Sequence, residues 1–257
     1  MKRIPNLVTL LNLFFGCIAI LFALQTENIV IKVQDDFSTA INIPERLSMA
    51  AVFIFFAAIV DFLDGFVARL FNATSELGKQ LDSLSDVVSF GVAPAAIMYQ
   101  LLRISYARFE NGLDVSILLL LPAFIISCAA AYRLGKFNLD ASQSHVFRGV
   151  PTPAVALFIA SLPLILHFGD VFHGINDWLI NVWVLYFIII AVSWLMISNI
   201  PMLALKFKNF TIKDNLPQFI LLIIAVLAAI FLKWLCVPLI FVAYIILSLA
   251  YKNKIAS

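Results

Sequence analysis

Charged residues are scarce in this chain, and their scarcity excludes an ordinary soluble domain. Asp, Glu, Lys and Arg make up 12% of the 257 residues, against about 25% in typical soluble domains. Hydrophobic residues make up 63%, and the mean hydropathy is +1.03. The net charge of +2 is too small to indicate a nucleic-acid-binding surface. We therefore expect an integral membrane protein with no nucleic-acid partner.

Cysteine is also rare, with three residues in the chain. Cys17, Cys128 and Cys236 each lie inside an apolar run, and they lack the paired spacing that cysteine metal sites use. These positions provide neither a disulfide framework nor a metal site. We interpret all three as buried small hydrophobic residues.

Long apolar runs make up most of what remains. They predict an all-α, polytopic transmembrane helical bundle with about eight spans. The expected spans are 5–24, 48–70, 84–103, 115–135, 150–168, 177–199, 216–232 and 235–251. If the N-terminus is cytoplasmic, twelve of the 17 basic residues fall in inner segments and five in outer ones. Because Lys and Arg accumulate on the cytoplasmic side, both termini are predicted to be cytoplasmic and the acidic loop 25–46 external.

Four aspartates interrupt the apolar pattern between residues 61 and 86. Asp61 and Asp64 are three residues apart and Asp82 and Asp86 are four apart, so each pair shares one helical face. Brought together, four carboxylates repel one another unless divalent cations lie between them. Oxygen ligands without a nearby histidine or cysteine favour Mg²⁺ or Mn²⁺ over zinc, and these cations usually handle phosphates. The alternative is that the aspartates cap helices or face a cytoplasmic loop.

Residues around the aspartates favour a phosphate-containing ligand. Gly65 and Ala68 have almost no side chain, which lets a bulky polar ligand lie against the helix. Arg69 offers a planar fork suited to phosphate oxygens. Ser75 and Gly78 can break the helix and offer hydrogen bonds to a sugar or base.

Two other groups of polar residues each have two interpretations. Near the start of the first span, Asn6 and Thr9 either reach a nucleotide at the cytoplasmic face or cap the helix. Near the end of the fourth span and before the fifth, Arg133 and Arg148 either anchor the cytoplasmic side or point into the bundle.

The spacing D-x2-D-G-x2-A-R-x8-G-x3-D-x3-D is met in full between residues 61 and 86. It resembles the signature of the CDP-alcohol phosphatidyltransferase family. The strings YRLGKFN, FRGVPTP, DSLSDVVSFGVAPA and SNIPMLALK make the chain similar to the phosphatidylserine synthase branch of that family over nearly its whole length. We expect a single membrane domain over 1–257, with a six-span catalytic core at about 1–200 and two additional spans in 201–257.

The resemblance implies an activity and a set of site residues. The activity is transfer of the phosphatidyl group of CDP-diacylglycerol to the hydroxyl of L-serine, giving phosphatidylserine and CMP, with two Mg²⁺ or Mn²⁺ ions. By analogy, Asp61, Asp64 and Asp82 hold the metals, while Asp86 completes the site and takes the proton from serine. Implied CDP-lipid contacts are Asn6, Thr9, Gly65, Ala68, Arg69, Ser75 and Gly78, and implied contacts to the serine carboxylate or lipid phosphate are Arg133, Asn138 and Arg148.

The family also implies a homodimer in a bacterial-type inner membrane, among membrane lipids, with its active site facing the cytoplasm. Two alternatives stay open. Within the family, the acceptor is glycerol 3-phosphate or an inositol phosphate, which needs more positive charge to bind its phosphate. Outside the family, a cation-coupled transporter predicts carboxylates near the bilayer midplane and paired broken helices, whereas these aspartates cluster towards one face.

Overall fold

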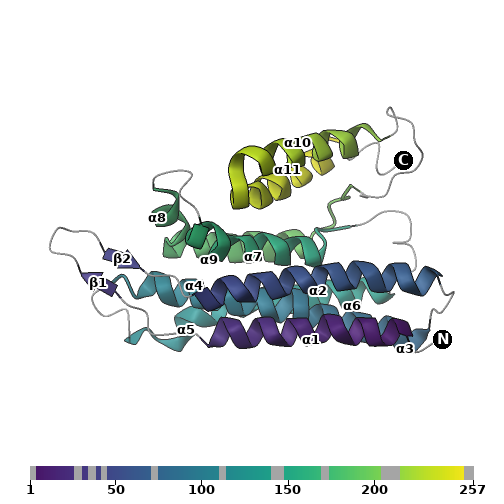
Figure 1. Ribbon diagram of the computed structural model, residues 1–257, viewed down its shortest axis with the longest axis horizontal. Helices are drawn as coiled ribbons and strands as arrows, with labels where there is room; N and C mark the ends of the chain where they lie inside the picture. Colours follow the sequence, from purple (N-terminus) through teal and green to yellow (C-terminus); the bar gives the residue numbers. More distant parts are fainter. Residues whose placement is uncertain are drawn as a thin grey trace.

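The computed structural model is a bundle of long helices that lie side by side (Figure 1). It describes residues 4–25, 31–33, 39–41, 45–70, 75–109, 114–139, 148–168, 174–203 and 215–251, and at residues 4 and 45 and in 31–33, 39–41 and 67–70 only the backbone is described. The start of α1 and the end of α11 lie at the same end of the bundle as α3 (Figure 1).

The described elements are helical apart from one short strand pair, which confirms the predicted all-α class. The first half contains α1 (Ile4–Leu24), α2 (Glu45–Leu70), α3 (Glu76–Asp86), the π-helical turn η1 (Val87–Val92), α4 (Ala93–Tyr106), α5 (Ile117–Leu120), the 3-10 turn η3 (Leu121–Phe124) and α6 (Ile125–Leu139). The second half contains α7 (Thr152–Phe168), α8 (Ile175–Leu179), α9 (Val182–Ile197), α10 (Leu216–Leu232), the 3-10 turn η5 (Lys233–Leu235) and α11 (Cys236–Ala250).

The strand pair lies in the stretch expected to be an external loop. Strand β1 (Ile31–Val33) pairs antiparallel with β2 (Thr39–Ile41), with Lys32 opposite Ala40. Periodicity did not predict these strands, because each contains only three residues.

Five helical stretches are long and apolar enough to cross a membrane. They are Pro5–Leu24, Arg46–Phe66, Glu76–Tyr106, Ile117–Leu139 and Leu216–Ala250, and two shorter apolar helices are Thr152–Phe168 and Val182–Ile197. The last long stretch contains both expected C-terminal spans. The chain turns between them at Lys233, where φ is +48°. The protein is therefore an integral membrane protein, while the count of eight spans stays a prediction.

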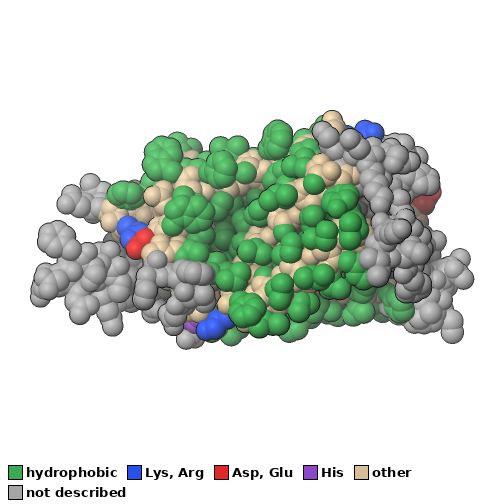
Figure 2. Space-filling view, turned by 90° about the horizontal axis from the view of Figure 1, so that it is seen from above, with side chains coloured by type: hydrophobic (Ala, Val, Ile, Leu, Met, Phe, Trp, Pro, Cys, Tyr) green, Lys and Arg blue, Asp and Glu red, His purple; other side chains and the backbone are tan. Residues whose placement is uncertain are grey.

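Packing places the third span at the centre. Of its most apolar 18-residue window, 72% is buried, against 28% in Pro5–Leu24 and 11% in Leu216–Ala250. The outer helices expose many large hydrophobic side chains, and the middle of the face that carries α10 and α11 is hydrophobic (Figure 2). Lys, Arg and Asp side chains lie towards the ends of that face (Figure 2), as expected for a bundle that contacts lipid around its waist.

Small residues allow the central span to approach its neighbours closely. A Cβ atom at Gly91 would lie 3.1 Å from Cβ of Ala130, and Ser127 Oγ donates to the Gly91 carbonyl oxygen over 3.1 Å. The central span and α6 therefore pack closely at Gly91. On the other side, a Cβ at Gly16 would lie 2.8 Å from Cα of Ser89. These two contacts fix the π-helical turn between α1 and α6.

Candidate functional site

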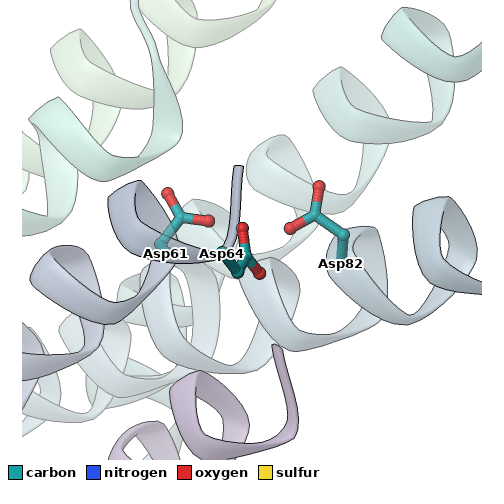
Figure 3. Close-up of side chains that lie close together, drawn as sticks. All are labelled: Asp61, Asp64 and Asp82. Atoms are coloured by element: carbon teal, nitrogen blue, oxygen red, sulfur yellow. The ribbon is translucent and has the colours of Figure 1, made fainter. Parts of the chain in front are cut away.

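Three of the four aspartates converge where α2 and α3 meet. Asp61 and Asp64 come from α2 and Asp82 from α3, and one carboxylate oxygen from each lies within 4.8 Å of the others (Figure 3). Asp61 and Asp64 lie inside their helix, so the alternative that they cap helices is wrong for them. The predicted meeting of the two aspartate pairs is confirmed for these three residues.

Asp86 lies one turn beyond Asp82, at the last position of α3. It is 8% exposed, and its carboxyl group lies close enough to that of Asp61 for a direct interaction. Nδ2 of Asn12 donates to Asp86 Oδ1 over 3.3 Å. The fourth aspartate therefore adjoins the three-carboxylate cluster and is held from α1.

Thr9 also joins α1 to the carboxylates. Its Oγ1 lies 2.9 Å from Asp64 Oδ2 and 3.1 Å from the Pro5 carbonyl oxygen, so its one hydroxyl hydrogen can be donated to either. Thr9 is 4% exposed, well inside the bundle. Thr9 lies inside α1 and is therefore not its cap, whereas its contact with a nucleotide stays a prediction.

Asn12 is a site residue that sequence reasoning missed. It is fully buried, and its backbone carbonyl accepts a 3.0 Å hydrogen bond from Ser89 Oγ. Its Oδ1 atom is buried without a hydrogen-bond partner among the described residues. The available signal was a lone amide side chain within an apolar span, three residues after Thr9 and thus on the same helical face.

A cavity of about 520 Å³ opens beside the carboxylates. Its lining contains five residues predicted to contact the CDP-lipid, namely Asn6, Thr9, Gly65, Ser75 and Gly78, together with Asp64 and Asp82. Glu76 and Lys79 also line it and were not predicted. A volume of this size is typical of pockets for ligands as large as a nucleotide. The cavity brings together residues from α1, α2 and the first turn of α3.

Helix α3 begins after Ser75 rather than at Gly78. Ser75 caps α3, and its Oγ accepts a 3.0 Å hydrogen bond from the Gly78 amide. Of the two residues expected to break the helix, Ser75 lies at the helix boundary, whereas Gly78 lies inside α3, where the cap satisfies its amide. A Cβ at Gly78 would lie 3.0 Å from Asn6 Oδ1, so glycine there lets α3 approach α1.

Two predicted contacts fall where only the backbone is described. Ala68 and Arg69 belong to α2, but their side chains lie outside the described residues. Gly65 is described, and a Cβ atom there would have no neighbour within 4 Å. Open space next to this glycine agrees with the expected approach of a ligand.

A second, smaller cavity lies among basic residues. Its volume is about 10 Å³, and its lining includes Arg133, Lys136 and Arg148 together with residues 196–198 of α9 and the segment after it. Arg133 is partly buried and lies close enough to Asp86 for a charge interaction. The Arg133 Nε atom is buried without a hydrogen-bond partner among the described residues. Of its two interpretations, orientation into the bundle is the one observed for Arg133.

Asn138 differs from the other predicted acceptor contacts. Its Nδ2 donates to Ser83 Oγ over 2.7 Å and so ties α6 to α3. It lines neither of the two cavities described above. The bond to Ser83 gives it a structural role next to Asp82.

The residues present fit a divalent cation bound by oxygen. The cluster consists of three carboxylates that are buried or partly buried, and closely spaced carboxylates repel one another without a countercharge. Neither histidine nor cysteine belongs to this group of described residues, which suits a hard cation. The cluster lies in the second half of α2 and on α3, towards one end of the bundle (Figure 1).

Comparison with known proteins gives the family. The chain is 32% identical to the CDP-diacylglycerol–serine O-phosphatidyltransferase of Helicobacter pylori over 86% of this chain and 78% of that protein. It is 30% identical to the protein of that name in Mycobacterium bovis, over 95% and 76%, and 32% identical to that in Bacillus subtilis, over 66% and 82%. Residues 2–196 match the pattern that defines one family, so this protein belongs to the CDP-alcohol phosphatidyltransferase family.

Proposed function

We propose that this protein transfers the phosphatidyl group of CDP-diacylglycerol to the hydroxyl of L-serine, giving phosphatidylserine and CMP. Its family and the activity named for several relatives support this reaction. The observation that carries the proposal is the meeting of Asp61, Asp64 and Asp82 within 4.8 Å beside a cavity of about 520 Å³. A metal-binding cluster next to a nucleotide-sized cavity suits chemistry on a pyrophosphate.

Divalent metal is the cofactor of this reaction. The family generally depends on such metals, and Asp61, Asp64 and Asp82 supply the hard oxygen ligands. We assign two Mg²⁺ or Mn²⁺ ions to them. When bound, the ions withdraw charge from the pyrophosphate and stabilise the departing phosphate of CMP.

The nucleotide part of the substrate is assigned to the larger cavity. Asn6 and Ser75 offer hydrogen-bonding side chains there, and Gly65 leaves space beside Asp64. Lys79 adds a positive charge that suits a phosphate oxygen. The diacylglycerol part then extends along the exposed hydrophobic surface of the bundle.

Asp86 is assigned as the base. A carboxylate oxygen of Asp86 accepts the hydroxyl proton of serine as the serine oxygen bonds to phosphorus and the bond from phosphorus to CMP breaks. Because the amide of Asn12 holds Asp86 Oδ1, the carboxylate keeps one orientation. Arg133, near Asp86, and Arg148 face the smaller cavity and are assigned to the serine carboxylate or the lipid phosphate.

The proposed membrane and orientation are based on the distribution of basic residues and on the family. We place the active site on the cytoplasmic side of a bacterial-type inner membrane, with both termini on that side, because twelve of the 17 basic residues then lie inside. The start of α1 and the end of α11 at the carboxylate end of the bundle support a shared side (Figure 1). A homodimer, a catalytic core at about 1–200 and two additional spans in 201–257 complete the proposal.

The test is an acceptor assay with purified protein in lipid nanodiscs. CDP-diacylglycerol and Mn²⁺ or Mg²⁺ are supplied with serine, glycerol 3-phosphate or an inositol phosphate, and CMP release is measured. We expect rapid release with serine alone and none when EDTA replaces the metal. Faster CMP release with a phosphorylated acceptor would show that serine is not the substrate. Absence of CMP release with every acceptor would overturn the proposed activity itself.

A further inference from the structure

The C-terminal hairpin formed by α10 and α11 lies beyond the family match, which ends at residue 196. Its two helices pack against each other, and α11 packs on α7, where Phe241 and Phe158 stack with ring centroids 4.6 Å apart. Most of the hairpin surface is exposed and apolar. Two of its residues are buried and polar, namely Tyr244 at 6% exposure and Ser248 at 0%.

These two side chains form hydrogen bonds with the backbone of one residue, Leu203. The Tyr244 hydroxyl donates to the Leu203 carbonyl oxygen over 3.1 Å, and Ser248 Oγ accepts from the Leu203 amide over 3.1 Å. Ser248 in turn donates to the Tyr244 carbonyl oxygen over 2.7 Å. Both backbone polar groups of the buried residue Leu203 are thus satisfied by α11. The hairpin is fastened to the segment 198–203 that follows α9.

Segment 198–203 also contacts residues that line, or lie next to, the smaller basic cavity. The Gly149 amide donates to the Ile200 carbonyl oxygen over 2.9 Å, and Arg148 forms an antiparallel bridge with Pro201. Lys136 Nζ donates to Asn199 Oδ1 over 2.9 Å. Segment 198–203 therefore contacts the residues that carry two of the three cations around the smaller cavity.

Gly149 makes this contact specific. Its φ is +74°, and a Cβ atom there would collide with the Met196 carbonyl oxygen and lie 2.9 Å from that of Ser198. The backbone of residues 148–150 can therefore lie against segment 198–203 only because residue 149 is glycine. The position of Arg148 depends on where that segment lies.

Arg133 links the hairpin to the reaction centre. Arg133, the third cation around the smaller cavity, lies near both Tyr244 of the hairpin and the assigned base Asp86. Its Nε is buried and has no protein partner among the described residues, which leaves a donor available to an anionic ligand.

We propose that the α10–α11 hairpin is a positioning element for the acceptor: Tyr244 and Ser248 hold segment 198–203, which holds Arg148 and Lys136 beside Arg133 around the carboxylate of the incoming serine. This inference rests on the proposed function, since it assigns the basic cavity to the acceptor. Tyr244 and Ser248 are positioning residues and touch neither substrate.

The variants Tyr244→Phe and Ser248→Ala test the inference in the full-length protein. Each removes one hydrogen bond to Leu203 while keeping most of the packing volume. We expect each to raise KM for serine by roughly fivefold and the double variant to raise it by more than about tenfold. The kcat and the KM for CDP-diacylglycerol are expected to stay within about twofold.

Tyr186→Phe is the matched control. The Tyr186 hydroxyl donates to the Leu119 carbonyl oxygen over 2.6 Å, away from both cavities, so its loss should leave KM for serine unchanged. Equal changes of both KM values and kcat in the hairpin variants would indicate general loosening and would overturn the inference. An unchanged KM for serine in the double variant would overturn it as well.

Amide hydrogen exchange separates this inference from the proposed reaction. In the double variant, faster exchange is expected at the Leu203 and Gly149 amides, with no change at the first turn of α3. Unchanged exchange at Gly149 would contradict the mechanical link whatever the substrate. If wild-type protein prefers another alcohol, the proposed acceptor fails, and KM for that alcohol then decides the role of the hairpin.

Discussion

The side-chain amide of Asn12 donates a hydrogen bond to Asp86 Oδ1 across 74 residues of sequence. We predict that Asn12→Ala lowers kcat for CMP release by about 10- to 100-fold, because the base loses the group that orients it. KM for CDP-diacylglycerol should change by less than about threefold. Steady-state kinetics measure both, with Asn181→Ala, which removes the cap of α9, as a control that should keep full activity.

Asp86→Asn should abolish turnover while leaving the lipid substrate bound. The amide cannot take the proton of serine, and general bases contribute about 10²- to 10⁴-fold to rates. Binding of CDP-diacylglycerol, measured as a shift in thermal unfolding, should stay close to wild type. Retained turnover in this variant would remove Asp86 from its assigned role.

Gly16→Ala should destabilise the protein by about 1–3 kcal/mol, because an added methyl group meets the backbone of Ser89 in a tightly packed contact. Thermal inactivation in detergent should therefore begin at a lower temperature. Gly135→Ala is the matched control, since a Cβ atom there has no neighbour within 4 Å. Equal thermal stability of the two variants would show that α1 and η1 are not packed as described.

Lys79→Gln should weaken the binding of CDP-diacylglycerol more than the binding of serine. Removing the positive charge from the larger cavity is expected to raise KM for CDP-diacylglycerol by about three- to tenfold and to leave KM for serine unchanged. Lys233→Gln, at the turn between α10 and α11, removes the same charge away from the cavity and should change neither constant.

Much of the bundle and the acidic cluster could be predicted because each depends on local pattern. Apolar runs have a length that the bilayer sets. The i,i+3 spacing of Asp61 and Asp64 and the i,i+4 spacing of Asp82 and Asp86 put each pair on one helical face. The third span was expected to begin at residue 84, where the apolar run starts. Helix α3 begins earlier, at Glu76, because Ser75 caps it there.

Residues whose roles depend on distant partners could not be predicted. Asn12, Tyr244 and Ser248 are single polar side chains within apolar spans, where pattern indicates only membrane packing. Their partners, Asp86 and the Leu203 backbone, become neighbours only when the helices pack. The strand pair 31–33 with 39–41 was missed for a different reason, because strands of three residues show no measurable alternation.

The central claim is that Asp61, Asp64 and Asp82 together bind the divalent cation on which turnover depends. Electron paramagnetic resonance titration of Mn²⁺ into nanodisc-embedded protein tests it most directly, with Asp82→Asn compared with wild type. We predict saturable Mn²⁺ binding that Asp82→Asn weakens by at least about 100-fold, since even outer-shell partners contribute about 10- to 100-fold, with CMP release lost in parallel. Equal Mn²⁺ affinity in the two proteins, or CMP release that continues in EDTA, would contradict the account.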